Sequence, residues 1–270
     1  MRSSAASDVY KRQPTFFFDY SVKDLRRDIT CCPFQWTKGV QTLQSFKSWS
    51  FGKLRYEWTN RMIPTGNDDG INRQYMRYAD IVLMRAELEN ELNGASAAVP
   101  YLTKIRNRAF ATSDRATEVT AYVAEAALSK EKMFQAIVDE RAYEFAGELI
   151  RKADLIRWGM LKSKMDETKN KMKAIVSLTD YDSKHPYSQL SGHAYYKMSA
   201  YTWTRNGIET TEKDAKLNLY GLNYGEMDIN PEGYTEFSDS KGEASTWIKD
   251  NALEDVIDYL YVRDPDKYQY

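Results

Sequence analysis

The sequence predicts a mostly α-helical fold, in which a helical core over about residues 74–174 is flanked by long irregular segments. Apolar residues recur at helical spacing through the core, whereas turn-forming Gly, Pro and Asn residues punctuate both flanks. A chain of 270 residues is long enough to bury a full hydrophobic core. We therefore expect residues 14–270 to form a single domain, with residues 176–270 rich in loops.

The first helix of the core is expected to bury more than one side. Two apolar stripes run along it at helical spacing, and a helix with two such stripes needs neighbours on two sides. The stripes comprise Tyr78, Ile81, Val82 and Arg85, and Ala79, Leu83 and Ala86. Gly94 is expected to end this helix, because glycine readily adopts the backbone conformation that follows a helix C-terminus.

Three more helices are expected after Gly94. In the second helix, Pro100 is expected in the first turn, where its missing N–H costs little. The third helix is expected to begin at Ser129, whose hydroxyl can accept from free backbone N–H groups. The fourth helix includes Ala153 and Met160, and its extension through Met172 is left open.

The flanks carry weaker structural signals. Residues 15–18 and 28–30 are expected to be short strands or extended segments, and a late helix is expected over about residues 245–258. Cys31 and Cys32 are the only cysteines. Adjacent cysteines rarely reach the geometry of a disulfide, so none is expected between them.

The composition narrows the classes of function. The net charge of −1 argues against nucleic-acid binding and against a basic membrane-binding surface, since both need an excess of cations. No run of about 18 apolar residues is present, so no membrane-spanning segment is expected. The 20 Tyr and 6 Trp have apolar rings with a polar O–H or N–H group, so they suit partly solvated contact surfaces such as those that bind sugars. The alternative is that the Tyr residues simply cover loop-rich surfaces.

Three glutamates, Glu140, Glu144 and Glu148, lie one helical turn apart. As paired carboxylates they could perform acid–base chemistry, but a glycosidase needs two carboxyl groups across the scissile bond, usually from separate elements. The favoured interpretation is a ladder of ion pairs between packed helices, with Asp154 and Arg157 as its second part. No catalytic residue is therefore assigned.

Residues 228–239 (DINPEGYTEFSD) match much of an EF-hand calcium loop. Pro231 within the loop, and Asp239 in place of the usual glutamate, argue against calcium, which is left open but not favoured. His185 and His193 have no ligand partners at metal-binding spacing, so no metal site is assigned. No cofactor is expected either, because the sequence contains no phosphate-binding loop or dinucleotide fingerprint.

Three segments resemble hallmark segments of the SusD/RagB family. They are residues 77–93 (RYADIVLMRAELENELN), 140–158 (ERAYEFAGELIRKADLIRW) and 22–30 (VKDLRRDIT). The resemblance implies helix pairs packed as in tetratricopeptide repeats. It also implies a non-catalytic outer-membrane lipoprotein at the cell surface, which captures glycans and delivers them to a SusC-like TonB-dependent transporter barrel.

Residues 1–13 lack the apolar region of a signal peptide, and they look like a translated sequencing adapter or a cloning scar. The resemblance covers roughly residues 16–178. The N-terminal half of the family's proteins has no counterpart in this sequence, so we expect the chain to be the C-terminal part of a longer protein. Its N-terminal lipid anchor, the only expected attachment to the membrane, is missing from this sequence.

The candidate ligand-binding residues are aromatic and lie in the two flanks. They are Trp36, Trp49, Trp203, Tyr201 and Trp58. Binding residues are often held on loops of a rigid framework, and a flat ring can cover the apolar face of a sugar. Two alternatives stay open: a tetratricopeptide-type scaffold that binds proteins and a glycan-active enzyme.

Overall fold

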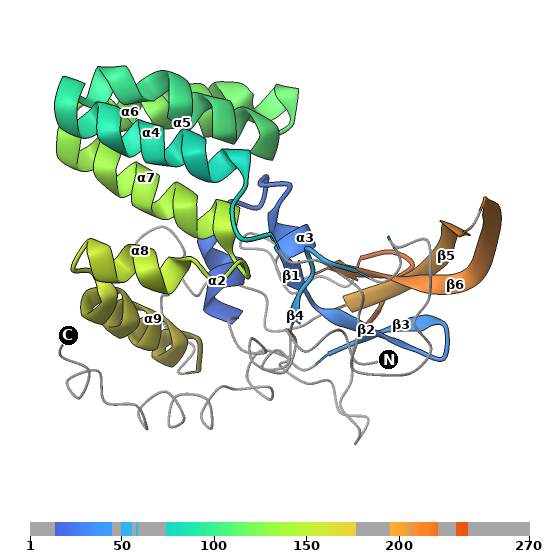
Figure 1. Ribbon diagram of the computed structural model, residues 1–270. Helices are drawn as coiled ribbons and strands as arrows, with labels where there is room; N and C mark the ends of the chain where they lie inside the picture. Colours follow the sequence, from blue (N-terminus) through green and yellow to red (C-terminus); the bar gives the residue numbers. More distant parts are fainter. Residues whose placement is uncertain are drawn as a thin grey trace. The chain divides into compact units, whose positions relative to one another are not determined.

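The structure is a computed structural model that describes residues 14–44, 50–55, 58, 74–176, 195–205, 207–220 and 231–236. The chain forms two compact units (Figure 1). The mixed unit comprises Met1–Asp19, Cys31–Asp69 and Gly159–Tyr270, and the helical unit comprises Tyr20–Thr30 and Gly70–Trp158. Most of the regular structure is helical, which confirms the predicted mostly α-helical fold class. The single domain expected for residues 14–270 stays a prediction.

The helical unit is built from helices, and those from α4 onward are joined by short turns. They are α3 (Arg27–Thr30), α4 (Tyr78–Asn93), α5 (Ala95–Ala109), η3 (Thr112–Asp114), the π-helical segment η4 (Ala116–Ala121), α6 (Tyr122–Ala126), α7 (Lys130–Phe145) and α8 (Arg151–Arg157). Leu83, Leu102, Met133 and Ile137, from α4, α5 and α7, are fully buried in one hydrophobic core. Gly94, at φ 88°, separates α4 from α5 as predicted.

Helix α4 buries one side, and the prediction of burial on two sides is wrong. Ala79, Leu83 and Ala86 are buried, whereas Tyr78 is 67% and Ile81 45% exposed. Since α5 and α7 both pack against α4, they share the side that carries Ala79 and Leu83. In the other stripe Val82 is buried as well, whereas Tyr78, Ile81 and Arg85 face outward.

Two details of the helix boundaries differ from expectation. Helix α5 begins directly after Gly94, so Pro100 lies inside the helix and not in its first turn. Pro100 is exposed, and water can reach the carbonyl group that the missing N–H leaves without a partner. The expected fourth helix is two helices, α8 and α9 (Leu161–Val176), because Gly159 adopts a left-handed conformation at φ 66° and ends the first of them.

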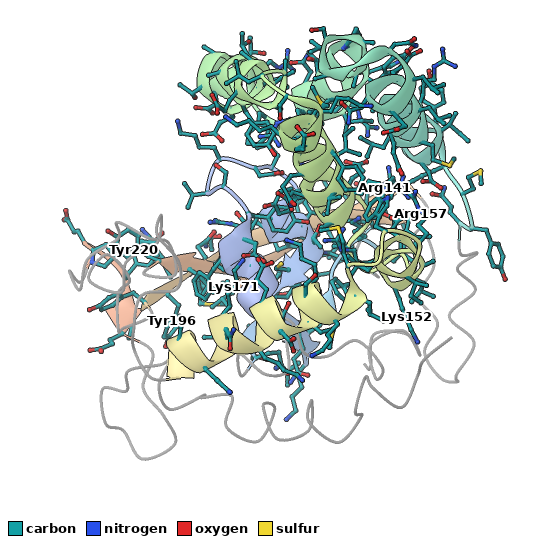
Figure 2. The ribbon with its side chains drawn as sticks, turned by 90° about the vertical axis from the view of Figure 1, so that its left-hand side faces the viewer. Arg141, Lys152, Arg157, Lys171, Tyr196 and Tyr220 are labelled. Carbon is teal, nitrogen blue, oxygen red and sulfur yellow. The ribbon has the colours of Figure 1, made fainter. Side chains whose placement is uncertain are left out.

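The mixed unit contains helices and short sheets. Its elements are α2 (Pro14–Asp19), α9, the antiparallel pair β1 (Cys31–Cys32) and β4 (Ser50–Phe51), the hairpin β2 (Phe34–Thr37) and β3 (Val40–Leu43), and the sheet of β5 (Tyr195–Arg205), β6 (Ile208–Tyr220) and β7 (Thr235–Glu236). Lys171 of α9 forms an ion pair with Asp19 of α2 at 2.7 Å (Figure 2). Cys31 and Cys32 are buried, and no disulfide joins them, as predicted.

Three expectations for the segments that flank the helical core are wrong. Residues 15–18 lie in helix α2, and residues 28–30 lie in helix α3 of the other unit, although both segments were expected to be extended. The prediction that residues 176–270 are rich in loops is wrong for residues 195–220, most of which form the long hairpin of β5 and β6. The expected helix at 245–258 lies outside the described residues. Within the described part of the chain, no helix is long and apolar enough to cross a membrane.

Candidate ligand-binding site

Three of the five predicted aromatic residues meet in the mixed unit. The ring of Trp36 on β2 lies 5.2 Å from that of Tyr201 and 6.2 Å from that of Trp203, both on β5. Trp36 meets each ring edge to face, and Tyr201 and Trp203 lie 5.6 Å apart with a smaller tilt of 36°. All three side chains are half-buried. This aromatic cluster is our candidate ligand-binding site.

Two hairpins bring the cluster together. The turn between β2 and β3 has positive φ at both Lys38 (51°) and Gly39 (84°), the combination that favours tight hairpins. Gln41 lies opposite Trp36, and its Oε1 accepts a hydrogen bond of 3.0 Å from the backbone N–H of Leu217 on β6. That bond holds the β2–β3 hairpin beside the β5–β6 hairpin. Each hairpin thus supplies part of one aromatic surface.

The strand register places polar groups beside the rings. Tyr201 and Trp203 are two residues apart and therefore point to the same face of β5. On the neighbouring strand, Glu212 lies opposite Tyr201 and Thr210 opposite Trp203. A surface with flat apolar rings and adjacent carboxylate and hydroxyl groups can cover the apolar face of a sugar while accepting hydrogen bonds from its hydroxyls.

Trp58 is linked to this cluster through a cation. The Arg55 guanidinium lies 5.0 Å from the ring of Trp58 and 5.2 Å from that of Phe34, which in turn meets Trp36 at 6.4 Å. Trp58 is 54% exposed. Sequence reasoning missed the supporting roles of Phe34 and Arg55. The fifth candidate, Trp49, lies outside the described residues.

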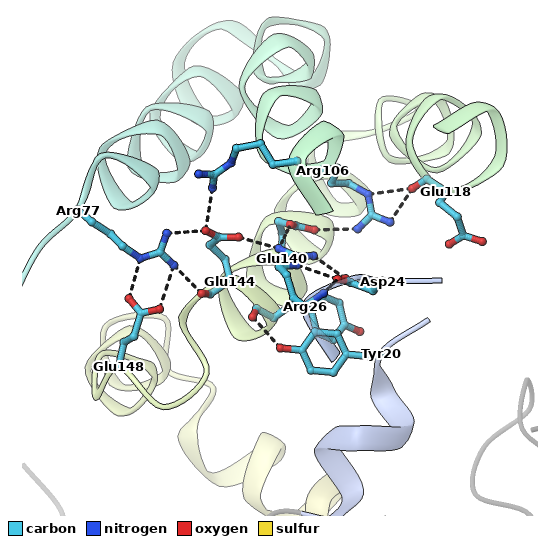
Figure 3. A network of polar contacts seen from close by, with 11 residues as sticks. Tyr20, Asp24, Arg26, Arg77, Arg106, Glu118, Glu140, Glu144 and Glu148 are labelled. Atoms are coloured by element: carbon cyan, nitrogen blue, oxygen red, sulfur yellow. Dashed lines mark hydrogen bonds and ion pairs between the residues drawn. The ribbon is translucent and has the colours of Figure 1, made fainter. Parts of the chain in front are cut away.

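Glu140 and Glu144 of α7, and Glu148 just after the helix, belong to a separate network in the helical unit (Figure 3). Glu140 is fully buried and accepts hydrogen bonds from Arg26 and Arg106, each at 2.7 Å. Glu144 accepts from Arg26 at 2.8 Å and from Arg77 at 2.5 Å. Arg77 also bonds both carboxylate oxygens of Glu148. These contacts confirm the predicted ladder of ion pairs.

The electrostatics of the network favour ionised carboxylates. Burial opposes ionisation of Glu144, but hydrogen bonds from Arg77 and Arg26 and the charges of both arginines outweigh it. They hold the pKa of Glu144 below its ordinary value of 4.5. A general acid needs a raised pKa and access to substrate, so this carboxylate suits a structural role.

The second part of the ladder of ion pairs, with Asp154 and Arg157, connects α8 to α7 and α4. Asp154 accepts from Arg141 at 2.7 Å and from Arg157 at 3.1 Å, and Figure 2 labels both arginines. Arg141 also forms an ion pair of 2.8 Å with Asp80, and Arg157 one of 2.5 Å with Glu87. Asp154 and Arg157 therefore act as predicted.

Metal-ligating side chains do not converge in the described part of the chain, where no group of three His, Cys, Asp or Glu side chains could hold a metal ion. Only residues 231–236 of the EF-hand-like segment 228–239 are described, and two of them form β7. His185 and His193 lie outside the described residues. Calcium binding at 228–239 therefore stays open.

Comparison with known proteins connects this chain to one family. The model of the SusD family matches residues 41–234. A SusD-like protein, P25 of Formosa agariphila, is 48% identical over 90 residues, which are 33% of this chain and 16% of that protein. The match thus spans less than a fifth of the relative's length. No solved structure matches the chain.

Proposed function

The chain belongs to the SusD family, and on that premise we propose that it captures glycans at the cell surface for uptake. The observation that carries this proposal is the cluster of Trp36, Tyr201 and Trp203, with Trp58 linked to it through Arg55. Rings that come from separate hairpins and remain half-buried offer a preformed apolar surface. A preformed surface lowers the entropic cost of binding a flexible chain of sugars.

We propose that binding occurs without turnover. A glycosidase needs two carboxyl groups that reach the same glycosidic bond. Glu140 is fully buried, and Glu144 is enclosed by arginines, so neither can approach a substrate without breaking the network. The glycan-active enzyme is accordingly the weaker alternative.

The test uses affinity gels that contain starch, laminarin, xylan or polygalacturonate. The 270-residue chain is expected to be retarded by at least one of these polysaccharides and to release no reducing ends from any. Trp36→Ala and Trp203→Ala should each weaken retention about tenfold, which corresponds to the loss of about 1.4 kcal/mol of aromatic contact. Tyr78→Ala, which removes an exposed ring in the other unit, is the matched control.

Two results would contradict the proposal. Migration that none of the four polysaccharides changes would argue against glycan capture. Release of reducing ends that disappears in Glu140→Gln or Glu144→Gln would assign the chain to the enzymes. Circular dichroism of each variant separates loss of binding from loss of folding.

We also propose that the full-length protein sits on the outer membrane and delivers glycans to a TonB-dependent barrel. The net charge of −1 over these 270 residues gives no overall attraction to anionic lipids, so attachment would depend on a lipid anchor and on protein contact. Tagged full-length protein extracted in mild detergent should bring a barrel-sized companion with it. Recovery of the protein alone would point to an independent binding protein.

A second candidate function, a scaffold that binds proteins, is favoured by the outer face of α4. Tyr78, Ile81, Leu88 and Leu92 are exposed there at spacings of three, four or seven residues, which is the pattern of a helix-binding stripe. Leu88→Lys is expected to abolish capture of a protein companion while leaving glycan retention unchanged. Loss of both activities in this variant would mean that the two functions share a surface.

A further inference from the structure

A second aromatic cluster lies at the other end of the β5–β6 hairpin. The ring of Tyr220 on β6 lies 6.4 Å from that of Tyr195 on β5 and 6.2 Å from that of Tyr234, which precedes β7. Tyr195 is buried, while Tyr220 and Tyr234 are half-buried. Tyr195 therefore forms the buried base of the cluster, and the rings of Tyr220 and Tyr234 form its solvent-facing part.

Both clusters lie on one face of the hairpin. Tyr195, Tyr201 and Trp203 occupy alternate positions of β5, and alternate residues of a strand point to the same side. The register shifts between Ser199 and Tyr201, but the extra residues belong to β6, where Asp214 adopts a positive φ of 54°. Strand β5 thus keeps its alternation along its whole length.

Polar groups fill the face between the clusters. Lys197 lies opposite Asn218, and Ser199 is the next residue of β5 on the same side. The Asn218 side-chain N–H group donates to the carbonyl of Lys197 and to the hydroxyl of Ser199, each at 2.9 Å. The carboxamide is therefore held in place, and amide, ammonium and hydroxyl groups are the kinds that bind sugar hydroxyls.

We propose that this face of the β5–β6 hairpin binds a single glycan chain across both aromatic clusters, with Tyr220 and Tyr234 as a second subsite. The inference rests on the proposed glycan-binding function and defines its ligand as an oligosaccharide longer than a disaccharide. Tyr195 and Tyr201 are six residues apart along β5, a separation of about 20 Å in an extended strand. A disaccharide can occupy one cluster, whereas a hexasaccharide can reach both.

The experiment is calorimetric titration of the 270-residue chain with matched sugars. The pairs are maltohexaose and maltose, laminarihexaose and laminaribiose, xylohexaose and xylobiose, and hexagalacturonate and digalacturonate. In a series that binds, the hexasaccharide is expected to bind about tenfold more tightly than the disaccharide, because tenfold corresponds to about 1.4 kcal/mol, which an added aromatic contact can supply. Equal affinities for the two lengths would overturn the inference.

Variants assign the length dependence to the second subsite. Tyr220→Ala and Tyr234→Ala should each weaken hexasaccharide binding about fivefold to tenfold and leave any disaccharide binding unchanged. Tyr220→Phe keeps the ring and should bind as the parent chain does. The control is Tyr196→Ala, because Tyr196 pairs with Leu219 and so lies on the opposite face from Tyr220 (Figure 2).

The results of these titrations distinguish failure of the second subsite from failure of the proposed glycan-binding function. If Tyr220→Ala and Tyr234→Ala both bind the hexasaccharide as the parent chain does, while Trp203→Ala binds it more weakly, the second subsite is overturned and the proposed function stands. Absence of binding in all four series, together with unchanged migration in the affinity gels, overturns both proposals. Circular dichroism identifies any variant that fails to fold, and if Tyr220→Ala does so, Tyr234→Ala decides whether the second cluster is needed.

Discussion

Glu140 is the clearest case in which one residue matters to the stability of the helical unit. Its carboxylate is fully buried between the guanidinium groups of Arg26 and Arg106. Glu140→Ala would leave two cations in a low-dielectric interior without their partner. We expect this substitution to lower the free energy of unfolding by about 3–5 kcal/mol.

Urea denaturation monitored by circular dichroism measures this effect. Glu125→Ala is the control, since it removes an exposed carboxylate that pairs with Lys132 on the surface, and exposed pairs contribute little. A loss in Glu140→Ala no larger than that in the control would mean that water or a rearranged carboxylate compensates the arginines.

At the scale of one element, α7 shows how a local signal fixes a helix boundary. Ser129 precedes the helix, and its Oγ accepts a hydrogen bond of 3.1 Å from the backbone N–H of Lys132. Ser129→Ala removes this acceptor and should lower the free energy of unfolding by about 1 kcal/mol. Ser129→Asp, which keeps an acceptor at this position, should retain most of the stability. Equal losses in the two variants would show that the cap is not the cause.

At the scale of the whole molecule, basic neighbours lower the pKa of several partly buried carboxylates. Burial opposes ionisation of Glu87, Glu144 and Glu167, but hydrogen bonds and charges from basic side chains outweigh it. These contacts lower the pKa of each below 4.5. Below that value the unfolded chain binds more protons than the folded chain does, so stability should fall as the pH falls through the lowered pKa values.

Urea midpoints between about pH 7 and about pH 3 test this expectation. The midpoint should hold near neutrality and decrease below about pH 4.5. Glu144→Gln removes one of the titrating groups, so it should reduce the slope of stability against pH in the acid range. Glu91→Gln on the exposed side of α4 is the control. A slope in Glu144→Gln as steep as that of the parent chain would contradict the assignment.

Local sequence signals were sufficient for the three long helices of the helical unit. Helices α4, α5 and α7 follow from apolar spacing, from Gly94 and from the cap at Ser129, all of which act within a few residues. The ladder of ion pairs also followed from sequence, because charges repeating at helical spacing usually pair with neighbouring helices. The family membership was foreseen from segments 77–93 and 140–158.

Local signals failed where distant segments decide the outcome. The exposed face of α4, with Tyr78, Ile81, Leu88 and Leu92, looks as apolar in the sequence as the buried face. Only the placement of α5 and α7 determines which face is covered. The β5–β6 hairpin was mistaken for loops, because its residues are largely polar on a strand that is exposed on much of its length. Strand pairing depends on a partner, and sequence spacing alone does not reveal it.

The sequence by itself determined the fold class, the family and the aromatic candidates, because those depend on residue types and short-range spacing. Tertiary structure alone decided that Trp36 meets Tyr201 and Trp203, although more than 160 residues separate them. The same holds for the pairing of Arg26 with Glu140, which are 114 positions apart. Such contacts form only when packing and strand register bring remote segments together, and no local propensity encodes them.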